Sequence, residues 1–228
     1  MANQRYALYH DDHGKSFDYV SGASGVSAAS LIHSGWGAQF LDYDNDGWKD
    51  LLVAQGHVMD NIELTQPALR YKEPLLLLRN SEGRFSNVSP SAGAPFRLSF
   101  ASRGMACGDL NNDGFPDIAI NCNDGPALVL MNQGGNGAHW LIVNTVGSRS
   151  NRDGIGARMK LISDSGRPQY AFVSTAGSYL SSGDRRVHFG LGTEQSVRLL
   201  EIIWPNGTLQ RLQNIKSDQI LTVREPAA

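Results

Sequence analysis

GWGAQFLDYDNDGWKDLLV, residues 35–53, is the stretch that decides the fold of this chain. Its centre places four aspartates at positions 1, 3, 5 and 9 of one short loop, with Gly47 at position 6. A hard cation such as Ca²⁺ takes oxygen ligands from alternate residues of a loop that turns sharply at a glycine. The backbone carbonyl of position 7 completes the expected ligand set, which is Asp42, Asp44, Asp46, Trp48 and Asp50.

The residues on either side of this loop predict strands. Apolar residues alternate before the loop, at Ala38 and Phe40, and follow one another after it, from Leu51 to Val53. The helix-flanked calcium loop, the EF-hand, would need a glutamate at position 12, where this chain has Val53. The sequence therefore predicts two strands joined by a cation-binding loop.

A second loop of the same kind begins 67 residues later, within GMACGDLNNDGFPDIAI, residues 104–120. Gly114 again takes position 6. A single acidic turn can be an ordinary surface feature, but two copies in register indicate an internal repeat and two Ca²⁺ sites. The expected ligands of the second site are Asp109, Asn111, Asp113, Phe115 through its carbonyl, and Asp117.

Weaker repeats surround the loops. Residues 6–20 align with residues 75–88, each an apolar strand, a polar turn with a glycine and a second strand, and a third copy begins at residues 128–133. Repeated units of short strands, none of which can bury its faces without its neighbours, are typical of propeller blades.

These motifs carry a family resemblance. Residues 6–133 resemble the calcium-binding FG-GAP (VCBS-type) repeats of propellers such as integrin heads, and residues 138–225 resemble the ASPIC/UnbV domain of proteins similar to cartilage acidic protein. The second likeness rests on SNRDGIGARM (150–159), GSYLSSGDRRVHFGLG (177–192) and IIWPNG (202–207). Such propellers usually close with about seven blades, whereas this chain carries about two, so the resemblance implies an open fragment or the C-terminal piece of a longer protein.

The pattern changes after Gly134–Gly137, which predicts a hinge there. Short strands follow without a helical period, and Asn206-Gly207 predicts a type I′ hairpin turn. The fold class is therefore expected to be all-β, with a partial β-propeller over residues 1–137 and a small antiparallel β-sandwich over residues 138–228. The strands expected in the second domain are His139–Thr145, Gly156–Ser163, Gln169–Ser174, Val187–Phe189, Val197–Trp204, Thr208–Leu212 and Ile220–Arg224.

Charge and composition narrow the classes of partner. The net charge of −2 divides into −6 over residues 1–137 and +4 over residues 138–228, and seven acidic residues of the first part lie in the two loops. The basic residues of the second part are dispersed, which argues against nucleic-acid binding. No apolar run is long enough to span a membrane, and the N-terminus lacks the core of a signal peptide. Because weak calcium modules work where calcium is abundant, we expect an extracellular or periplasmic location.

Two further features yield expectations about structure. The segment His57–Glu73 interrupts the repeat, and a solvated loop is the favoured interpretation over a binding loop. For the cysteines, a hairpin register that sets Ala106 opposite Ile120 would put Cys107 and Cys122 on different faces of the sheet, as free thiols.

No enzyme motif is complete in this sequence. Two short glycine pairs, at residues 154–156 and 190–192, lack the third glycine of a phosphate loop, and Ser24 is not in a GxSxG context. His188 is expected to be a buried, hydrogen-bonded residue inside the sandwich. The chain is therefore expected to have no catalytic residues.

Two functions remain open. The favoured one is a non-catalytic, calcium-binding interaction or adhesion module, secreted, with a protein or glycan partner. The alternative is the accessory end of a calcium-dependent carbohydrate-active enzyme, similar to polysaccharide lyases, for which His57 would be the candidate near a loop. Self-association through uncovered blade edges, for example at Leu75–Leu78, is also expected.

Overall fold

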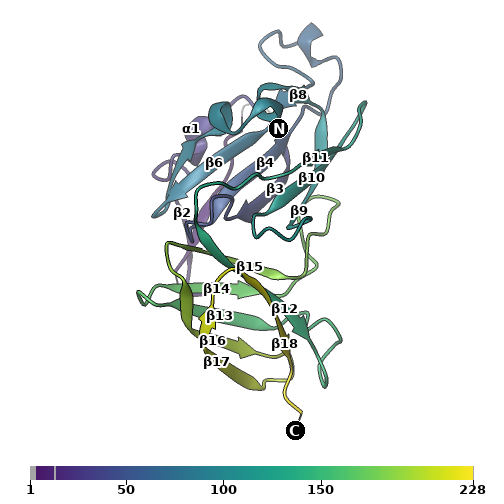
Figure 1. Ribbon diagram of the computed structural model, residues 1–228. Coiled ribbons are helices and arrows are strands. Elements are labelled where there is room, and N and C mark those ends of the chain that lie inside the picture. The colour runs from purple at the N-terminus through teal and green to yellow at the C-terminus, as the bar shows by residue number, and fades with distance from the viewer. Residues whose placement is uncertain (1–3, 13, 228) are drawn as a thin grey trace.

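Short antiparallel sheets make up almost all of the computed structural model, which describes residues 4–12 and 14–227. Helical structure within these residues is limited to α1 (Val26–Ser30) and to the 3-10 turns Ile62–Leu64, Ser89–Ser91 and Ala94–Arg97. The predicted all-β class is confirmed. Figure 1 shows the strands up to β11 in the upper part of the molecule and the strands from β12 onward in the lower part.

The upper part contains two sheets that each hold one of the acidic loops. The first sheet has the order β3-β4-β6-β7 and the second the order β11-β10-β9. The loops lie within the hairpins β3–β4 and β9–β10, as predicted. The bounds are β3 (Gly35–Leu41), β4 (Asp50–Gln55), β6 (Leu76–Ser81), β7 (Arg84–Asn87), β9 (Ser102–Gly108), β10 (Asp117–Cys122) and β11 (Leu128–Leu130), with the small pairs β1 (Tyr9–Asp11) and β2 (Phe17–Tyr19), and β5 (Glu73–Pro74) and β8 (Ser99–Phe100).

The two loop-bearing sheets share an apolar core, as neighbouring blades do. Leu52 and Leu77 from the first sheet pack with Met105 and Ile120 from the second. The backbones approach closely where β3 meets β9, because a Cβ atom on Gly37 would lie 2.7 Å from the Cβ of Met105. The described strands form an open arrangement without a closed barrel, which agrees with a partial propeller.

The strand that was expected to present an open edge does not do so. β6 lies between β4 and β7 and pairs with both. The segment Leu75–Leu78 is therefore covered by its own sheet, and the edges of that sheet are β3 and β7. Self-association through blade edges stays a prediction, with those strands in place of β6.

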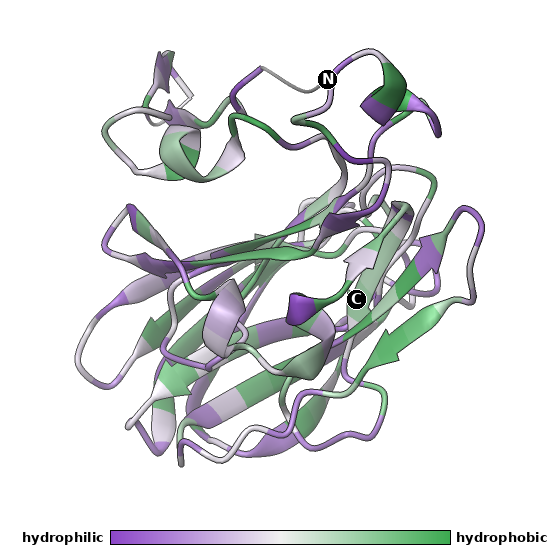
Figure 2. Ribbon diagram, turned by 90° about the horizontal axis from the view of Figure 1, so that it is seen from above, coloured by the Kyte–Doolittle hydropathy of each residue, from purple (hydrophilic) through white to green (hydrophobic). Residues whose placement is uncertain are grey.

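The lower part is a sandwich of two sheets, ordered β15-β12-β18 and β14-β13-β16-β17. Leu141 and Phe189 of the first sheet pack against Leu161 and Leu200 of the second, around the buried ring of Trp204. The strands are β12 (His139–Val146), β13 (Arg158–Ser163), β14 (Pro168–Phe172), β15 (Val187–Gly192), β16 (Ser196–Ile203), β17 (Leu209–Lys216) and β18 (Gln219–Arg224). Figure 2 shows hydrophobic and hydrophilic segments succeeding one another along the strands, as expected where one face is buried.

Two details of the sandwich differ from the prediction. β12 and β18 pair in parallel, so the sandwich is not purely antiparallel. The turn at Asn206-Gly207 is not type I′, because only Gly207 has a positive φ, 88°. Pro205, with its fixed negative φ, favours a type I turn, and Gly207 then takes the left-handed position of a three-residue hairpin loop. The Gly207 N–H donates to the carbonyl of Trp204 at 2.8 Å.

The cysteine geometry also differs. Ala106 pairs with Ala119 and Cys107 with Ile118, one residue away from the predicted register. Cys107 and Cys122 therefore lie on the same face, where both pack against the shared core. A shift of one residue reverses which face a side chain occupies, which explains the error. Both cysteines are free thiols, as expected, and burial raises the pKa of Cys107 to about 12.

The insertion over residues 57–73 is anchored and not merely solvated. Ile62 and Leu69 are buried, and the Arg103 guanidinium donates to the carbonyl of His57 at 2.9 Å. The His57 ring accepts a hydrogen bond from the Met59 N–H within the insertion itself.

Within the described residues, no helix is long and apolar enough to cross a bilayer.

The end of the chain is fixed by one buried carboxylate. Glu225 Oε2 accepts 2.8 Å hydrogen bonds from the backbone N–H groups of Ser148, Arg149 and Ser150. Burial alone would raise the pKa of Glu225, but these donors and the Ser150 hydroxyl outweigh it and lower the pKa to about 2. The charged form of this carboxylate therefore ties β18 to the loop that follows β12.

We expect Glu225→Gln to lower the melting temperature at neutral pH, because an amide cannot accept three N–H groups on one oxygen as a carboxylate does. A carboxyl group with a lowered pKa stabilises the fold above its unfolded pKa of about 4.3, and this contribution is lost as the pH falls toward 2. The gap in melting temperature between the native chain and the variant should therefore narrow below about pH 4.5. Glu201→Gln, at a partly exposed carboxylate paired with Arg211, is the control. An equal gap at pH 7 and pH 2.5 would contradict the prediction.

Candidate metal centre

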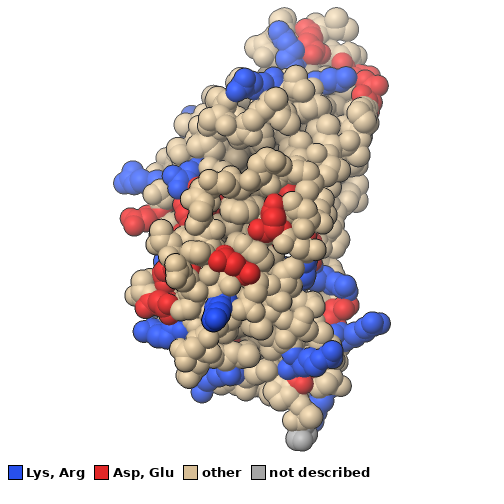
Figure 3. Space-filling model, in the orientation of Figure 1, with Lys and Arg blue, Asp and Glu red and all other residues tan. Residues whose placement is uncertain are grey.

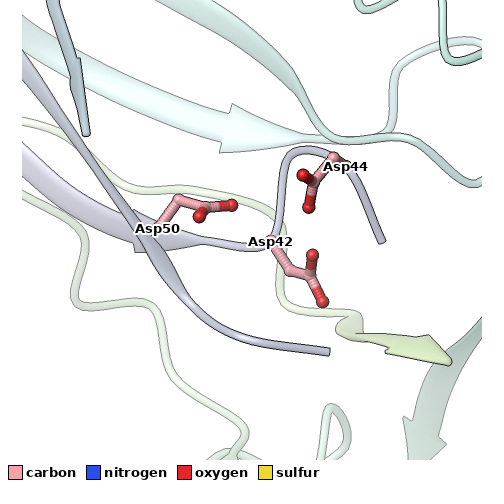
Figure 4. Close-up of side chains that lie close together, drawn as sticks. All are labelled: Asp42, Asp44 and Asp50. Atoms are coloured by element: carbon pink, nitrogen blue, oxygen red, sulfur yellow. The ribbon is translucent and has the colours of Figure 1, made fainter. Parts of the chain in front are cut away.

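Three aspartates of the first loop meet in one small space. One carboxylate oxygen from each of Asp42, Asp44 and Asp50 lies within 4.8 Å of the other two, and Figure 4 shows the three side chains close together at the loop. The turn itself depends on left-handed backbone at Asn45 and Gly47, with φ of 58° and 85°. Asn and Gly are the residues that adopt this conformation at least cost, which explains their place in the loop.

The unpaired atoms of this cluster fit a cation. Among the residues that the structure describes, Asp42 Oδ1 and Asp44 Oδ1 are buried without a hydrogen-bond partner. Burial, reinforced by neighbouring carboxylates, raises the pKa of Asp42 to about 7, and burial likewise raises that of Asp50 to about 7. Buried carboxylates that repel one another are unfavourable in their charged form unless a positive charge compensates them. The cluster could therefore hold a metal ion.

Two basic side chains reduce this repulsion without filling the space. Arg79 donates to Asp44 Oδ2 at 2.7 Å and to Asp46 Oδ2 at 2.9 Å. Lys49 is half-buried beside Asp42 and Asp50, and burial lowers the pKa of its ammonium group although those carboxylates oppose the shift. The net charge of this group is still negative, with four aspartates against two cations.

The second loop repeats the hydrogen bonds of the first. The position 6 N–H donates at 2.8 Å to the position 1 carboxylate in both loops, from Gly47 to Asp42 and from Gly114 to Asp109. The ninth-position aspartate accepts in both loops from the position 2 backbone N–H, from Tyr43 to Asp50 at 3.1 Å and from Leu110 to Asp117 at 2.8 Å, and also from one asparagine further on. Those asparagine N–H donors are Asn80 to Asp50 and Asn132 to Asp117, each at 2.8 Å.

The second loop is more open than the first. Asp109 and Asp117 are buried, but Asn111 and Asp113 are exposed and bonded to each other at 2.7 Å. In the described residues, its acidic groups do not come together as a set of three. The neutral amide of Asn111 and this exposure would both make cation binding weaker at the second loop than at the first.

The two loops contact each other. The Asn45 side chain donates to the carbonyl of Gly114 at 3.1 Å, and the Asn132 side chain donates to the carbonyl of Tyr43 at 2.8 Å. Each bond joins a residue of one blade's loop region to the other blade. The sites are thus parts of one connected surface.

That surface is covered by the C-terminal sandwich. The Gly192 N–H donates to the carbonyl of Asn45 at 2.7 Å, and the Arg186 guanidinium donates to the carbonyl of Asp109 at 2.6 Å. Arg167 donates to the carbonyl of Asp46 at 3.1 Å and lies over the ring of Trp48, 4.3 Å from its centroid. Both loops therefore form the contact surface between the blades and the sandwich.

The two faces of strand β15 contact different parts of the molecule. Phe189 and Leu191 point into the sandwich core, whereas His188 and Gly190 lie against the loops. His188 Nε2 contacts the carbonyl of Gly114 at 3.0 Å, and burial together with Lys49 lowers the pKa of His188 to about 3, so the ring is neutral. The histidine is hydrogen-bonded as expected, but it is half-buried and lies outside the sandwich core.

The predicted ligands are thus distributed unevenly. Asp42, Asp44 and Asp50 converge, while Asp46 is held by Arg79 and by the Trp48 N–H at 2.8 Å. Ligation by the carbonyls of Trp48 and Phe115 stays a prediction. Sequence reasoning missed the contacts of Arg79, Lys49 and the covering strand β15, because the spacing of the loop residues carries no signal for them.

Positive and negative side chains are mixed on the surface of the described residues, without a large region of one sign. On the face drawn in Figure 3, Lys and Arg side chains are interspersed with Asp and Glu. This agrees with the expectation that the acidity of the first part belongs mostly to its loops.

Comparison with known proteins supports both halves of the sequence-based resemblance in coarse form. A family model described as "ASPIC and UnbV" matches residues 147–228. Integrin alpha-7 from Mus musculus is 32% identical over 117 residues, which is 48% of this chain and 9% of the integrin. Integrin alpha-7 from Homo sapiens is 32% identical over 106 residues, which is 44% of this chain and 8% of the integrin. The chain thus spans less than a tenth of the length of these relatives.

Proposed function

We propose that this chain is a non-catalytic, calcium-binding interaction module that works in an extracellular or periplasmic setting. In this proposal, residues 6–133 are FG-GAP-type blades, and calcium in their two loops fixes the surface on which the ASPIC/UnbV-like sandwich rests. The likeness to integrin alpha-7 supports the first assignment, and the family match supports the second. Similarity to cartilage acidic protein is part of the same proposal.

One observation carries this function. The oxygens Asp42 Oδ1 and Asp44 Oδ1 are buried beside Asp50 without a partner among the described residues. Carboxylate oxygens are the ligands that Ca²⁺ prefers, and calcium affinity rises with the charge of the ligand set. Magnesium should compete poorly, because it demands a tighter octahedron and keeps its waters.

Reciprocal exchange of the position 3 ligand tests the proposal. The first loop has Asp44 at this position and the second has Asn111. We expect two binding events when calcium is titrated into chelator-treated protein by calorimetry, the tighter one at the first loop. Asp44→Asn should weaken the tighter event at least about tenfold, which is about 1.4 kcal/mol, and Asn111→Asp should strengthen the weaker one.

The two substitutions are matched controls for each other, since both keep the size of the side chain. If Asp44→Asn affects the weaker event and Asn111→Asp the tighter, the order of the sites is reversed. If calcium uptake is absent or unchanged in both variants, the loops are acidic turns and the proposed function fails.

A further inference from the structure

The sandwich presents a second surface that the loops do not use, on the outer face of the sheet β14-β13-β16-β17. Residues of β14 alternate, so that Gln169 points inward and the ring side chains Pro168, Tyr170 and Phe172 point outward. Tyr170 and Phe172 are 70% and 65% exposed. Two large exposed aromatic rings on an edge strand are an aggregation hazard that folded proteins avoid unless the surface has a use.

A row of basic side chains runs beside this row of rings. Arg158 pairs with Phe172 and Lys160 with Tyr170 across the β13–β14 ladder. The Lys160 ammonium lies 5.9 Å from the centroid of the Tyr170 ring, within reach of a cation–π contact. Residues two apart on a strand are about 6.6–6.8 Å apart and face the same way. The result is a track along the strands with rings on one side and positive charges on the other.

The remaining strands add no net charge to these two rows. On β16 and β17, Glu201 and Arg211 stand in the same row as Tyr170 and Lys160. Arg211 Nε contacts Glu201 Oε1 at 2.7 Å, so the single acidic side chain in these two rows already has a partner. Arg158 and Lys160 are left as the cations that an outside ligand could reach, because both are at least partly exposed.

We propose that this track binds an acidic polysaccharide, with sugar rings stacked on Tyr170 and Phe172 and sulfate or carboxylate groups on Lys160 and Arg158. The inference rests on the proposed function as an interaction module and names the class of its partner. The charge of the track selects an anionic ligand. Its rings select one that also presents flat, weakly polar faces, and a ladder of repeating side chains suits a repeating polymer.

Two other classes of partner fit the face less well. A membrane surface is bound by apolar side chains that sink about 5–10 Å below the headgroups, but these rings lie on a flat sheet among charged neighbours. A protein interface usually has an apolar core within a polar rim, whereas here rings and charges stand in adjacent rows. Single-stranded nucleic acid could also stack on rings beside cations, and the experiment therefore includes it.

The test is calorimetric titration of the full chain, in calcium, with a short heparin oligosaccharide and with its chemically desulfated form. We expect the sulfated form to bind more tightly than the desulfated form, which keeps only its carboxylates, and we expect both to bind more weakly as salt rises. Tyr170→Ala and the double variant Arg158→Gln/Lys160→Gln should each weaken binding at least about tenfold. Leu209→Ala, at an exposed residue on the far strand of the same face, should not change it.

Several results would overturn the inference. They are absence of binding to the sulfated oligosaccharide, binding that Tyr170→Ala leaves intact, and equal or tighter binding to a single-stranded oligonucleotide or to anionic lipid vesicles through the same residues. The variant Asp44→Asn separates the two proposals, because it should weaken calcium binding without weakening the binding of the oligosaccharide. Calcium uptake that Asp44→Asn leaves unchanged, with the oligosaccharide still bound, would refute the proposed calcium sites without affecting the proposed polysaccharide surface.

Discussion

Removing calcium should lower the melting temperature of the full chain by roughly 10–20 °C. A ligand that binds only the folded state adds about 2.7 kcal/mol per site at a free concentration of one hundred times Kd. Two sites would therefore contribute an amount comparable with the total stability of about 5–15 kcal/mol that folded proteins have, and 1 kcal/mol corresponds to about 2–4 °C in a chain of this size. Calorimetry with calcium and with chelator measures the shift.

The same treatment should loosen the sandwich from the blades. Without a cation, Arg79 and Lys49 relieve the repulsion among Asp42, Asp44 and Asp50 only in part, and we expect the loop that carries the carbonyls of Asn45 and Asp46 to lose its order. Cleavage by a non-specific protease near residues 134–137 should then increase. Asp124→Asn, at an exposed carboxylate outside both loops, should respond to chelator as the native chain does. The prediction would be refuted if neither the melting temperature nor the cleavage rate changed when chelator was added.

The second large effect is expected from Gly190→Ala. A Cβ atom at Gly190 would lie 2.1 Å from Asp42 Oδ2 and 2.6 Å from the Cα of Asn45, which is far inside contact distance. β15 would have to move away from the first loop, since the atoms it meets include backbone. Forcing one extra carbon into a packed contact costs about 1–3 kcal/mol. We expect a lower melting temperature and weaker calcium binding at the first loop, because Asp42 is both the clashing group and a proposed ligand.

Gly22→Ala is the matched control for this prediction. A Cβ atom at Gly22 would meet nothing within 4 Å, and Gly22 does not need a positive φ. The same change of residue type should therefore be nearly neutral there. If Gly190→Ala melted and bound calcium as the control does, the close contact between β15 and the first loop would be wrong.

The fold was predictable where a local pattern determines it. Both loop hairpins and the strands of the sandwich lie within a few residues of their expected places, because alternation and turn residues specify strands locally. Pairing between distant strands has no such local signal, so the parallel β12–β18 pair was missed. At Asn206-Gly207 the preceding Pro205 changed the turn type, and in β9–β10 a register error of one residue reversed the face of a cysteine.

The candidate site was predictable in its residue types but not in its surroundings. Spacing alone located Asp42, Asp44 and Asp50, which the structure brings together. It could not show that Arg79, which is 29 or more residues away in sequence, forms ion pairs with two of the aspartates. Nor could it show that the sandwich rests on the loops, since this contact joins residues far apart in sequence, such as Arg186 and Asp109, which are 77 residues apart.

The parallel pairing of β12 with β18 governs when this part of the chain can acquire its structure during synthesis. β12 is the first strand of the sandwich and β18 the last, and their ladder joins Leu141 to Gln219 at one end and Val146 to Arg224 at the other. Contacts between residues so distant in sequence form slowly, because loop closure precedes any gain from pairing. The sheet β15-β12-β18 therefore stays incomplete until Gln219–Arg224 have left the ribosome, and until then one side of β12 is an unpaired edge that is prone to aggregation.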